Sequence, residues 1–216
     1  MDRREFSAAA AGVLGTAALG LSGGAHAQQR PQEGKDYRVL DKPAPVETPA
    51  GKIEVVEFFW YSCPHCNVFE PKLVAWSKKI PPDVVLKRVP VAFRDDFVPQ
   101  QRLFYVLEAM GKVDELHSKV FHAIHNEKQP TSKEDTILAF AEKNGLNKAK
   151  FQELYNSFSV STKARRAKQL QDQYMVDGVP ALGIAGRWYT DATMTGSMER
   201  ALQVADHLVA EARKAK

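Results

Sequence analysis

The chain has 216 residues, with 30 Lys and Arg against 26 Asp and Glu, so its formal net charge at pH 7 is a mild +4. This charge is spread along the chain without a Lys/Arg block or a nucleic-acid motif, which predicts solubility and no nucleic-acid partner. A chain of this length buries an adequate core without disulfide staples. Its only two cysteines are therefore expected to do chemistry rather than hold the fold together.

The first 27 residues have the order of an export signal. Arg3-Arg4 precedes a stretch rich in Ala, Gly and Leu, which ends in the small-x-small sequence Ala25-His26-Ala27. The apolar stretch is too short and too rich in Ala and Gly for a convincing transmembrane helix. We expect residues 1–27 to be cleaved, leaving 28–216 as the mature domain.

The route of export is left open by the residues around the two arginines. The order Arg3-Arg4-Glu5-Phe6 is similar to the twin-arginine export signal. Asp2 stands where that signal usually carries Ser or Thr, and no Lys follows, so the general secretory route remains an alternative. Either route delivers the protein outside the cytoplasm, where disulfides persist.

The first half of the mature chain predicts a β-α-β unit. Residues 37–40 have the pattern of a short strand, and the nearly continuous apolar run 53–60 predicts a strand buried on both faces. From Pro64 the apolar spacing becomes helical, with Pro71 expected to kink or break the helix. The apolar run 84–93 predicts a second strand, which lies parallel to the first.

The second half predicts helices and then a return to sheet. Residues 98–173 are mostly of helical pattern, and Thr131-Ser132-Lys133-Glu134 predicts a capping box that opens a helix over 137–143. Strand signals return at 179–185 and 187–189, with a hairpin turn at Gly186 between them, and 198–214 predicts an amphipathic helix. The expected fold class is α/β, one domain whose sheet-forming parts are interrupted by a helical insertion at about 97–173.

Cys63-Pro64-His65-Cys66 lies at the junction of the first buried strand and the following helix. A C-x-x-C at such a junction is the signature of a thioredoxin-like dithiol/disulfide site, whose chemistry is thiol–disulfide exchange. With Cys63 as N-cap, Pro64 takes the first helical position, where its missing N–H is not needed. The Cys63 sulfur then faces free backbone N–H groups and the positive end of the helix dipole, and a protonated His65 adds a second favourable charge. These features predict Cys63 as the exposed, attacking cysteine and Cys66 as the buried, resolving one.

A zinc site and an inert disulfide are the alternatives for the two cysteines. Zinc needs two more ligands, and the chain has no other cysteines. His117, His122 and His125 lie too far along the chain for ordinary finger spacing, and their segment predicts a solvent-exposed helix face. We expect no metal and no bound cofactor.

Two further positions are informative. A carboxylate inside an apolar strand, as Glu57 is, has a raised pKa if it is buried, and beside Cys66 it could pass a proton to or from that sulfur. An equal alternative places Glu57 at a strand edge in contact with solvent. Gly178-Val179-Pro180 opens the returning sheet segment, and from the residues alone a trans peptide bond before Pro180 is favoured.

Together these residues resemble the DsbA family of periplasmic thiol:disulfide interchange proteins. Glu57-Phe58-Phe59 followed by Cys63-Pro64-His65-Cys66 looks like the active-site strand and motif of that family, and Gly178-Val179-Pro180 looks like its cis-proline loop. The long helical segment lies where the family inserts a helical domain into the thioredoxin fold. C-P-H-C is a specific motif, because thioredoxins and disulfide isomerases usually carry other residues between the cysteines.

The resemblance implies a role for each candidate residue. Cys63 is the nucleophile that hands over the disulfide, His65 is the main tuner of its pKa, and Glu57 is the buried acid. Pro180 is cis and faces the disulfide, while the Val179 backbone pairs with an extended substrate by strand addition. The resemblance also implies a periplasmic location, substrates that are unfolded or newly exported proteins with free cysteines, and re-oxidation by a DsbB-type quinone-linked membrane oxidase.

We therefore expect a monomeric disulfide oxidase that donates the Cys63–Cys66 disulfide to newly exported proteins. A reductase or isomerase uses the same chemistry, although an isomerase would normally carry an added dimerisation domain, for which the chain has no length left. From a different class, a peptide-binding chaperone would depend on its groove more than on its cysteines.

Overall fold

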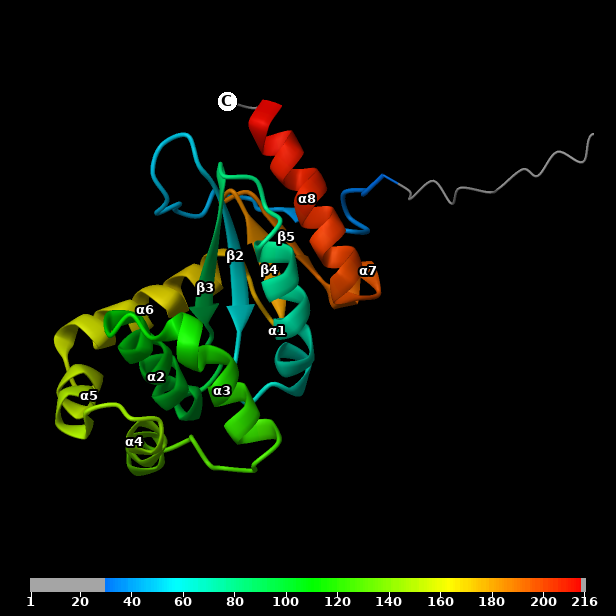
Figure 1. The fold of residues 1–216 in the computed structure, drawn as a ribbon. Helices are drawn as coiled ribbons and strands as arrows, with labels where there is room; N and C mark the ends of the chain where they lie inside the picture. The colour runs from blue at the N-terminus through cyan, green and yellow to red at the C-terminus, as the bar shows by residue number, and fades with distance from the viewer. Residues whose placement is uncertain (1–29, 215–216) are drawn as a thin grey trace, which may run out of the picture. The chain divides into compact units, whose positions relative to one another are not determined.

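The computed structural model describes residues 30–214 (Figure 1). The predicted export signal at 1–27 lies outside the described residues, so its cleavage stays a prediction. Between residues 30 and 214, no helix combines the length and the apolar character needed to cross a membrane.

A five-stranded mixed sheet, of order β1-β5-β4-β2-β3, forms the centre of the fold. β2 lies parallel to β3 and antiparallel to β4, and β5 pairs antiparallel with both β4 and β1. The strand bounds are β1 Arg38–Val39, β2 Ile53–Phe59, β3 Val84–Pro90, β4 Ala181–Ile184 and β5 Trp188–Asp191. The predicted parallel pair and the predicted hairpin around Gly186 are both confirmed.

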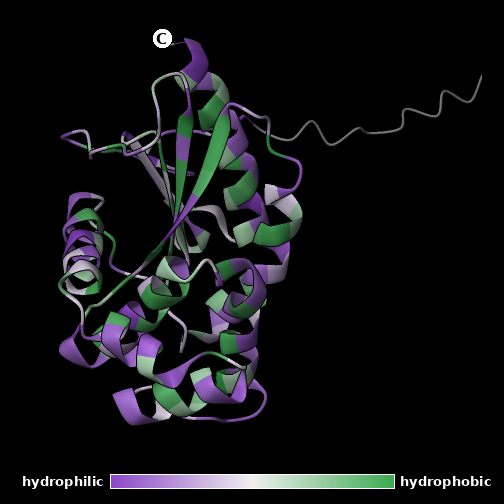
Figure 2. Cartoon of the chain, turned by 60° about the vertical axis from the view of Figure 1, so that its left-hand side comes forward, coloured by the Kyte–Doolittle hydropathy of each residue, from purple (hydrophilic) through white to green (hydrophobic). Residues whose placement is uncertain are grey.

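Helices cover both faces of this sheet, which explains why β2 is buried along its whole length. Alternate residues of β2 enter two different cores: Val56 and Phe58 join the core shared with the helical insertion, while Ile53 and Val55 join the core beneath α1 (Pro64–Ser77) and α8 (Met198–Lys214). In Figure 2 the central strands are mostly hydrophobic, and the helices carry both hydrophobic and hydrophilic residues. This is the pattern expected of amphipathic helices packed on a buried sheet.

The helical insertion lies between β3 and β4, next to the ends of β2 and β3 at which their arrows point (Figure 1). Its elements are the short 3-10 helix η1 Asp95–Phe97, α2 Val98–Ala109, α3 Val113–His125, α4 Glu134–Lys143, α5 Lys148–Tyr155 and α6 Phe158–Gln173. A last short helix, α7 (Ala192–Thr195), joins β5 to α8. The expected α/β class with inserted helices is confirmed.

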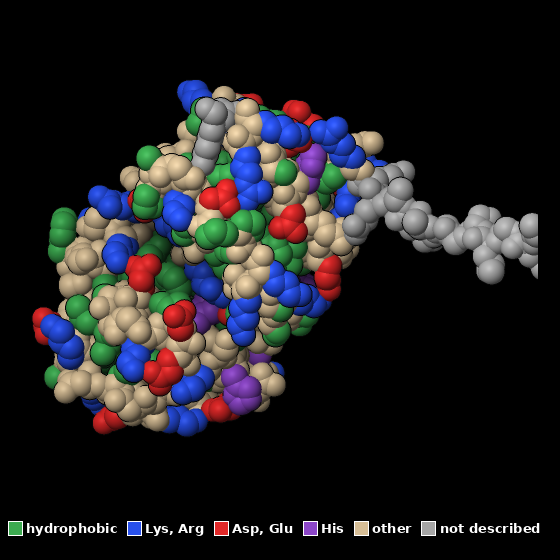
Figure 3. Space-filling model, turned by 45° about the horizontal axis from the view of Figure 1, so that its top comes forward, with side chains coloured by type: hydrophobic (Ala, Val, Ile, Leu, Met, Phe, Trp, Pro, Cys, Tyr) green, Lys and Arg blue, Asp and Glu red, His purple; other side chains and the backbone are tan. Residues whose placement is uncertain are grey.

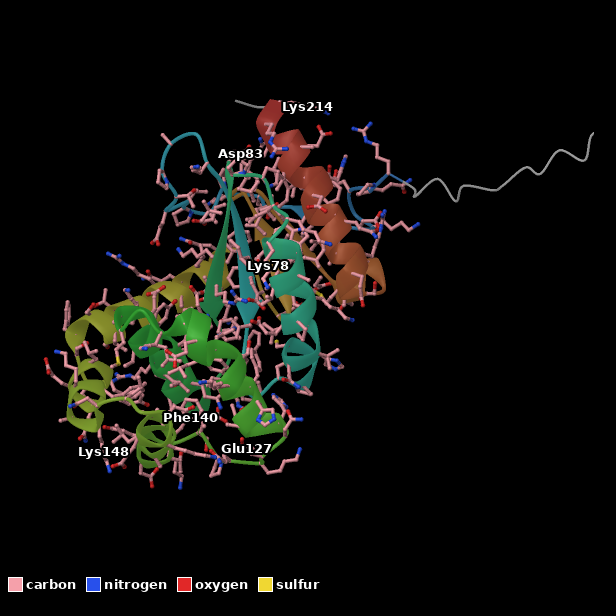
Figure 4. All side chains as sticks on the ribbon, viewed as in Figure 1. Lys78, Asp83, Glu127, Phe140, Lys148 and Lys214 are labelled. Carbon is pink, nitrogen blue, oxygen red and sulfur yellow. The ribbon has the colours of Figure 1, made fainter. Side chains whose placement is uncertain are left out.

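An ion pair joins the C-terminal end of α8 to the connection that precedes β3. Arg213 donates through Nε and Nη2 to both carboxylate oxygens of Asp83, each at 2.8 Å. Figure 4 shows Asp83 and the neighbouring Lys214 at the same end of the molecule. On the face drawn in Figure 3, Lys and Arg side chains are interspersed with Asp and Glu, in keeping with the mild net charge.

Two local predictions need correction. Helix α1 continues through Pro71 to Ser77, so the expected break is wrong, while a kink at Pro71 stays a prediction. Helix α4 begins at Glu134, and the hydroxyl of Thr136 pairs with the Lys133 backbone, so the predicted capping box does not form. The Thr131 hydroxyl is instead buried and accepts a hydrogen bond from Gln100 of α2, because packing within the insertion outweighs local capping.

Gly183 of β4 lies against the ring of Tyr174. A Cβ at position 183 would lie 2.3 Å from Cε1 of that ring. The ring cannot easily retreat, because Tyr174 is buried and its hydroxyl accepts a hydrogen bond from the Gly186 backbone N–H at 3.0 Å. We expect Gly183→Ala to lower the free energy of unfolding by about 1–3 kcal/mol, as overpacked cores do, measured by urea denaturation.

Gly178→Ala is the matched control for this change. A Cβ at position 178 meets open space, and Gly178 has no positive φ. Its free energy of unfolding should stay close to that of the wild type. Equal destabilisation by both substitutions would contradict the packing explanation.

Candidate active site

Cys63 and Cys66 are free thiols at the start of α1. Cys63 is the N-cap, with the extended backbone angles that an N-cap requires, and the Cys66 backbone N–H donates to its Sγ at 3.3 Å. Pro64 takes the first helical position, as predicted. The strand-to-helix junction thus places the Cys63 sulfur over the free N–H groups of the first helical turn.

Burial separates the two cysteines less than the sequence suggested. Cys66 is 0% exposed, and Cys63 keeps only 6% of its surface. The predicted order of accessibility is confirmed, but the expectation of an openly exposed Cys63 is wrong. Pro64 and His65 are exposed above it.

The pKa values of the two thiols move in opposite directions. The pKa of Cys63 is lowered to about 6, chiefly by the hydrogen bond from the Cys66 side chain and, against the effect of burial, by the backbone N–H groups of Cys66 and His65. The charge of His65 contributes less than these hydrogen bonds, and its role as main tuner stays a prediction. Burial raises the pKa of the Cys66 thiol, and the hydrogen bond that it donates to Cys63 raises it further. At neutral pH, Cys63 is therefore a thiolate and Cys66 keeps its proton.

The loop before β4 closes over the dithiol from a distant part of the chain. The Val179–Pro180 peptide bond is cis, so the trans bond favoured from the residues alone is wrong and the isomer implied by the resemblance is confirmed. Sγ of Cys63 lies 3.3 Å from the Val179 carbonyl oxygen, which accepts a hydrogen bond from this thiol when it is protonated. The two segments of the predicted site therefore meet at the sulfur of Cys63.

A groove of about 660 Å³ runs beside the dithiol. Its lining includes Phe69 and the Gly178-Val179-Pro180 loop, and Val68 presents an apolar side chain that is 61% exposed. Lys72 and Glu199, which also line the groove, pair with each other. The groove offers apolar surface and the backbone of the Val179 loop next to the reactive sulfur.

Glu57 lies in β2 with no exposed surface, so the alternative that placed it at a solvated strand edge is wrong. Burial raises the pKa of Glu57 to about 8, against the attraction of the Arg88 guanidinium. Among the described residues, neither carboxylate oxygen of Glu57 has a hydrogen-bond partner. The charge of Glu57 in turn contributes to the raised pKa of Cys66, after burial and the interactions with Cys63.

Arg88 and Glu70 complete this buried cluster, and neither was predicted from the sequence. Nη2 of Arg88 donates to the two oxygens of Glu70 at 2.8 and 2.9 Å, while its Nε lies 3.2 Å from Oε2 of Glu57. Two features of the sequence could have indicated them. Arg88 is a charged residue in the strand predicted to pair with that of Glu57, and it lies opposite Glu57 in the sheet. Glu70 follows Cys66 by four residues, about one helical turn, in the predicted helix.

His117 joins the cluster from α3. It is 3% exposed, so the predicted solvent-exposed face is wrong for this histidine, although His122 is exposed. Ligand-type atoms of Glu57, Glu70 and His117 lie within 4.8 Å of one another. A metal ion does not fit there as the side chains stand, because Arg88 already supplies the positive charge to both carboxylates. Neither cysteine belongs to this group.

The comparisons with known proteins identify the fold and its chemistry. Residues 71–203, a segment that begins after the C-P-H-C motif, match the family described as a DSBA-like thioredoxin domain. The chain belongs to the DsbA family. It is therefore a thiol:disulfide oxidoreductase with a thioredoxin-like fold, and its dithiol motif agrees with a family match made without it.

Individual DsbA relatives cover most of the chain. The Thiol:disulfide interchange protein DsbA of Burkholderia cepacia is 42% identical over 186 residues, which span 86% of this chain and 88% of the relative. A crystal structure of Pseudomonas aeruginosa DsbA is 41% identical with a TM-score of 0.80, over 84% of this chain and 94% of that one. The DsbA oxidoreductase of Xylella fastidiosa is 29% identical, also with a TM-score of 0.80, over 85% and 98%.

The split in thiol pKa values is open to direct titration. In the reduced protein, ultraviolet thiolate absorbance should rise with an inflection near pH 6 that belongs to Cys63. Cys63→Ser should abolish this inflection, and Cys66→Ala should shift it upward, because alanine removes the side-chain donor to the Cys63 sulfur. Two thiols ionising together at their ordinary pKa would contradict the site as described.

Glu57 makes stability depend on pH with a defined sign. Its folded pKa of about 8 lies above the ordinary 4.5, so its contribution is fully present below pH 4.5 and is lost as the pH rises through 8. Glu57→Gln has no proton to lose. The free energy of unfolding of the reduced protein, measured by urea denaturation, should therefore rise for the variant relative to the wild type between pH 4.5 and about pH 8. Above pH 8 the difference between the two proteins should stay constant.

Glu70→Gln is the matched comparison for the change at Glu57. The pKa of Glu70 is lowered by His117 and Arg88 despite its burial, so this carboxylate stabilises the fold above its ordinary pKa and loses that effect in acid. Its variant should be less stable than the wild type at neutral pH. A Glu57→Gln difference that does not vary with pH would contradict the raised pKa.

Proposed function

We propose that this DsbA-family protein is a disulfide oxidase of exported proteins. A substrate thiolate attacks the Cys63 sulfur, the Cys63–Cys66 bond breaks, and its electron pair leaves on Cys66, which takes up a proton. A second substrate thiolate then attacks the substrate sulfur of the mixed disulfide and releases Cys63 as a thiolate. Two electrons pass from the substrate thiols to the protein, and the substrate gains a disulfide.

The observation that carries this direction is the lowered pKa of Cys63 beside the raised pKa of Cys66. A thiolate stabilised at Cys63 favours the reduced protein, so its disulfide readily accepts electrons. The better-stabilised thiolate is also the better leaving group when the mixed disulfide is resolved. Both effects drive the substrate toward its oxidised form.

The groove supports an extended, unfolded substrate. Val179 lies at the loop edge against the Cys63 sulfur, where a peptide can add its backbone as a strand. Val68 and Phe69 offer apolar contact along the groove with no need for a particular side-chain sequence. We infer that the substrates are unfolded or newly exported proteins with free cysteines.

The proposal also covers the location of the protein, the partner that re-oxidises it and its oligomeric state. The export-type sequence at 1–27 and the DsbA relatives support a periplasmic location. Turnover requires that the reduced dithiol be oxidised again, for which we propose a DsbB-type quinone-linked membrane oxidase. We propose a monomer. The reductase, isomerase and chaperone alternatives are not favoured by the family comparison.

The redox equilibrium with glutathione tests the proposed direction. Fluorescence of Trp60, which lies three residues before Cys63, follows the state of the dithiol. We expect a potential well above that of the glutathione pool. A potential in the thioredoxin range would indicate a reductant and overturn the oxidase proposal.

Two cysteine variants test the roles proposed for the sulfurs. Cys63→Ser should lose all oxidation of a reduced protein substrate, because no sulfur remains to form the mixed disulfide. Cys66→Ser should accumulate mixed disulfides when the variant is mixed with an oxidised substrate, because the resolving thiol is gone. Oxidation retained by Cys63→Ser would sink the proposal, and retained holding of unfolded protein by an inactive Cys63→Ser would favour a chaperone.

A further inference from the structure

A histidine of the helical insertion contacts the buried charges beneath the dithiol. Nε2 of His117 lies 3.5 Å from Oε2 of Glu70, and its Nδ1 lies 2.8 Å from the hydroxyl of Tyr61. The ring packs edge-on against the aromatic rings of Phe59, Phe104 and Phe121. Nothing in the reaction described above uses this residue, although it is buried and titratable.

The partners of His117 fix where its proton sits. Burial raises the pKa of Tyr61 well above its ordinary value, so the tyrosine keeps its O–H and donates it to Nδ1. An ionised Glu70 can only accept, so the proton of the neutral imidazole is assigned to Nε2. Burial lowers the pKa of His117 itself, which favours this neutral form. The separation of 3.5 Å is long for a hydrogen bond, so the N–H acts on Glu70 mainly through its dipole.

Glu57 and Glu70 both face Arg88, and His117 favours the ionised form of Glu70. Two buried carboxylates face a single guanidinium, and both cannot be ionised at low cost. Glu70 receives both hydrogen bonds of Nη2 and faces the His117 N–H as well. Glu57 faces only the Arg88 Nε at 3.2 Å, without a hydrogen bond. The proton that the pair must hold consequently resides on Glu57.

We propose that His117 is a positioning residue for the proton of Cys66: its Nε2–H keeps Glu70 ionised on Arg88, which leaves Glu57 protonated and able to deliver a proton to the Cys66 sulfur. When a substrate thiolate opens the disulfide, the S–S electron pair goes to Cys66, the Glu57 proton follows it, and Glu57 regains a proton from solvent. The inference rests on the roles proposed above for Cys63 and Cys66.

Charged and titratable groups face His117 from four parts of the fold. β2 supplies Glu57, α1 supplies Glu70, β3 supplies Arg88, and the loop after β2 supplies Tyr61. About two helical turns further along α3, Nε2 of His125 lies 2.8 Å from the Tyr61 backbone oxygen. The insertion thus contacts Tyr61 through two histidines of one helix.

Three substitutions separate this role from simple packing. His117→Leu removes the N–H and keeps an apolar side chain, while His117→Gln keeps a side-chain N–H in place of Nε2. Phe121→Leu loosens the same aromatic cluster without removing a polar contact. The three variants allow the N–H and the packing of the ring to be judged separately.

The measurement is the rate at which glutathione reduces the oxidised protein, followed by tryptophan fluorescence across the range from about pH 5 to 9. Dividing each variant's rate by the wild-type rate at the same pH cancels the ionisation of glutathione. Without the His117 N–H, the shared proton moves toward Glu70 and Glu57 ionises about one pH unit lower. The ratio for His117→Leu should stay flat in acid and fall about tenfold above pH 8, the pKa of Glu57.

The controls make the outcome decisive. His117→Gln and Phe121→Leu should keep ratios that do not vary with pH, even if Phe121→Leu melts at a lower temperature. A flat ratio for His117→Leu, or an equal fall in all three variants, overturns the role of His117. Glu57→Gln should be slow in acid and approach the wild type in alkali; if it matches the wild type throughout, Glu57 delivers no proton and the inference fails, while oxidation lost in Cys63→Ser still upholds the oxidase.

Discussion

The hydrogen bond from the Cys66 backbone N–H to the Cys63 sulfur is the contact on which the site depends. At the N-cap of α1, the sulfur of Cys63 takes the place that the side-chain oxygen of Ser, Asp or Asn usually occupies. The group that caps the helix is therefore also the reactive group. The first turn of the same helix also carries the second, buried sulfur. Two identical side chains three residues apart thus acquire opposite acid–base behaviour: the Cys66 side chain and the backbone N–H groups lower the pKa of Cys63, and burial raises that of Cys66.

The charges below the dithiol are costly, and their arrangement explains why they remain. Burying Glu57, Glu70 and Arg88 together stabilises the fold little compared with apolar residues of the same size. The pairing is unequal, since one carboxylate takes two hydrogen bonds and the other takes none. An unequal pair holds one proton in a defined place within a dry interior, which an apolar core cannot do. The cluster therefore suits proton transfer better than it suits stability.

Local pattern was enough for much of the fold and for the reactive motif. The apolar run of β2, the hairpin at Gly186 and the N-cap position of Cys63 each follow from a few neighbouring residues. The isomer at Pro180 and the burial of His117 depend on contacts across the fold, which no window of the sequence contains. The sequence predicted a solvent-exposed helix face for His117, whereas the fold brings this residue into contact with Tyr61 and Glu70.

The helical insertion places a large part of the chain between the two halves of the site. Cys63 and its partner Val179 are 116 residues apart in the sequence, and the pairing of β4 with β2 also joins segments on either side of the insertion. Contacts between residues so far apart in the sequence form slowly, because the intervening chain must first be closed into a loop. During synthesis, moreover, the dithiol motif is made before the loop that covers it. The catalyst of disulfide formation is itself complete only once nearly all of its chain has emerged.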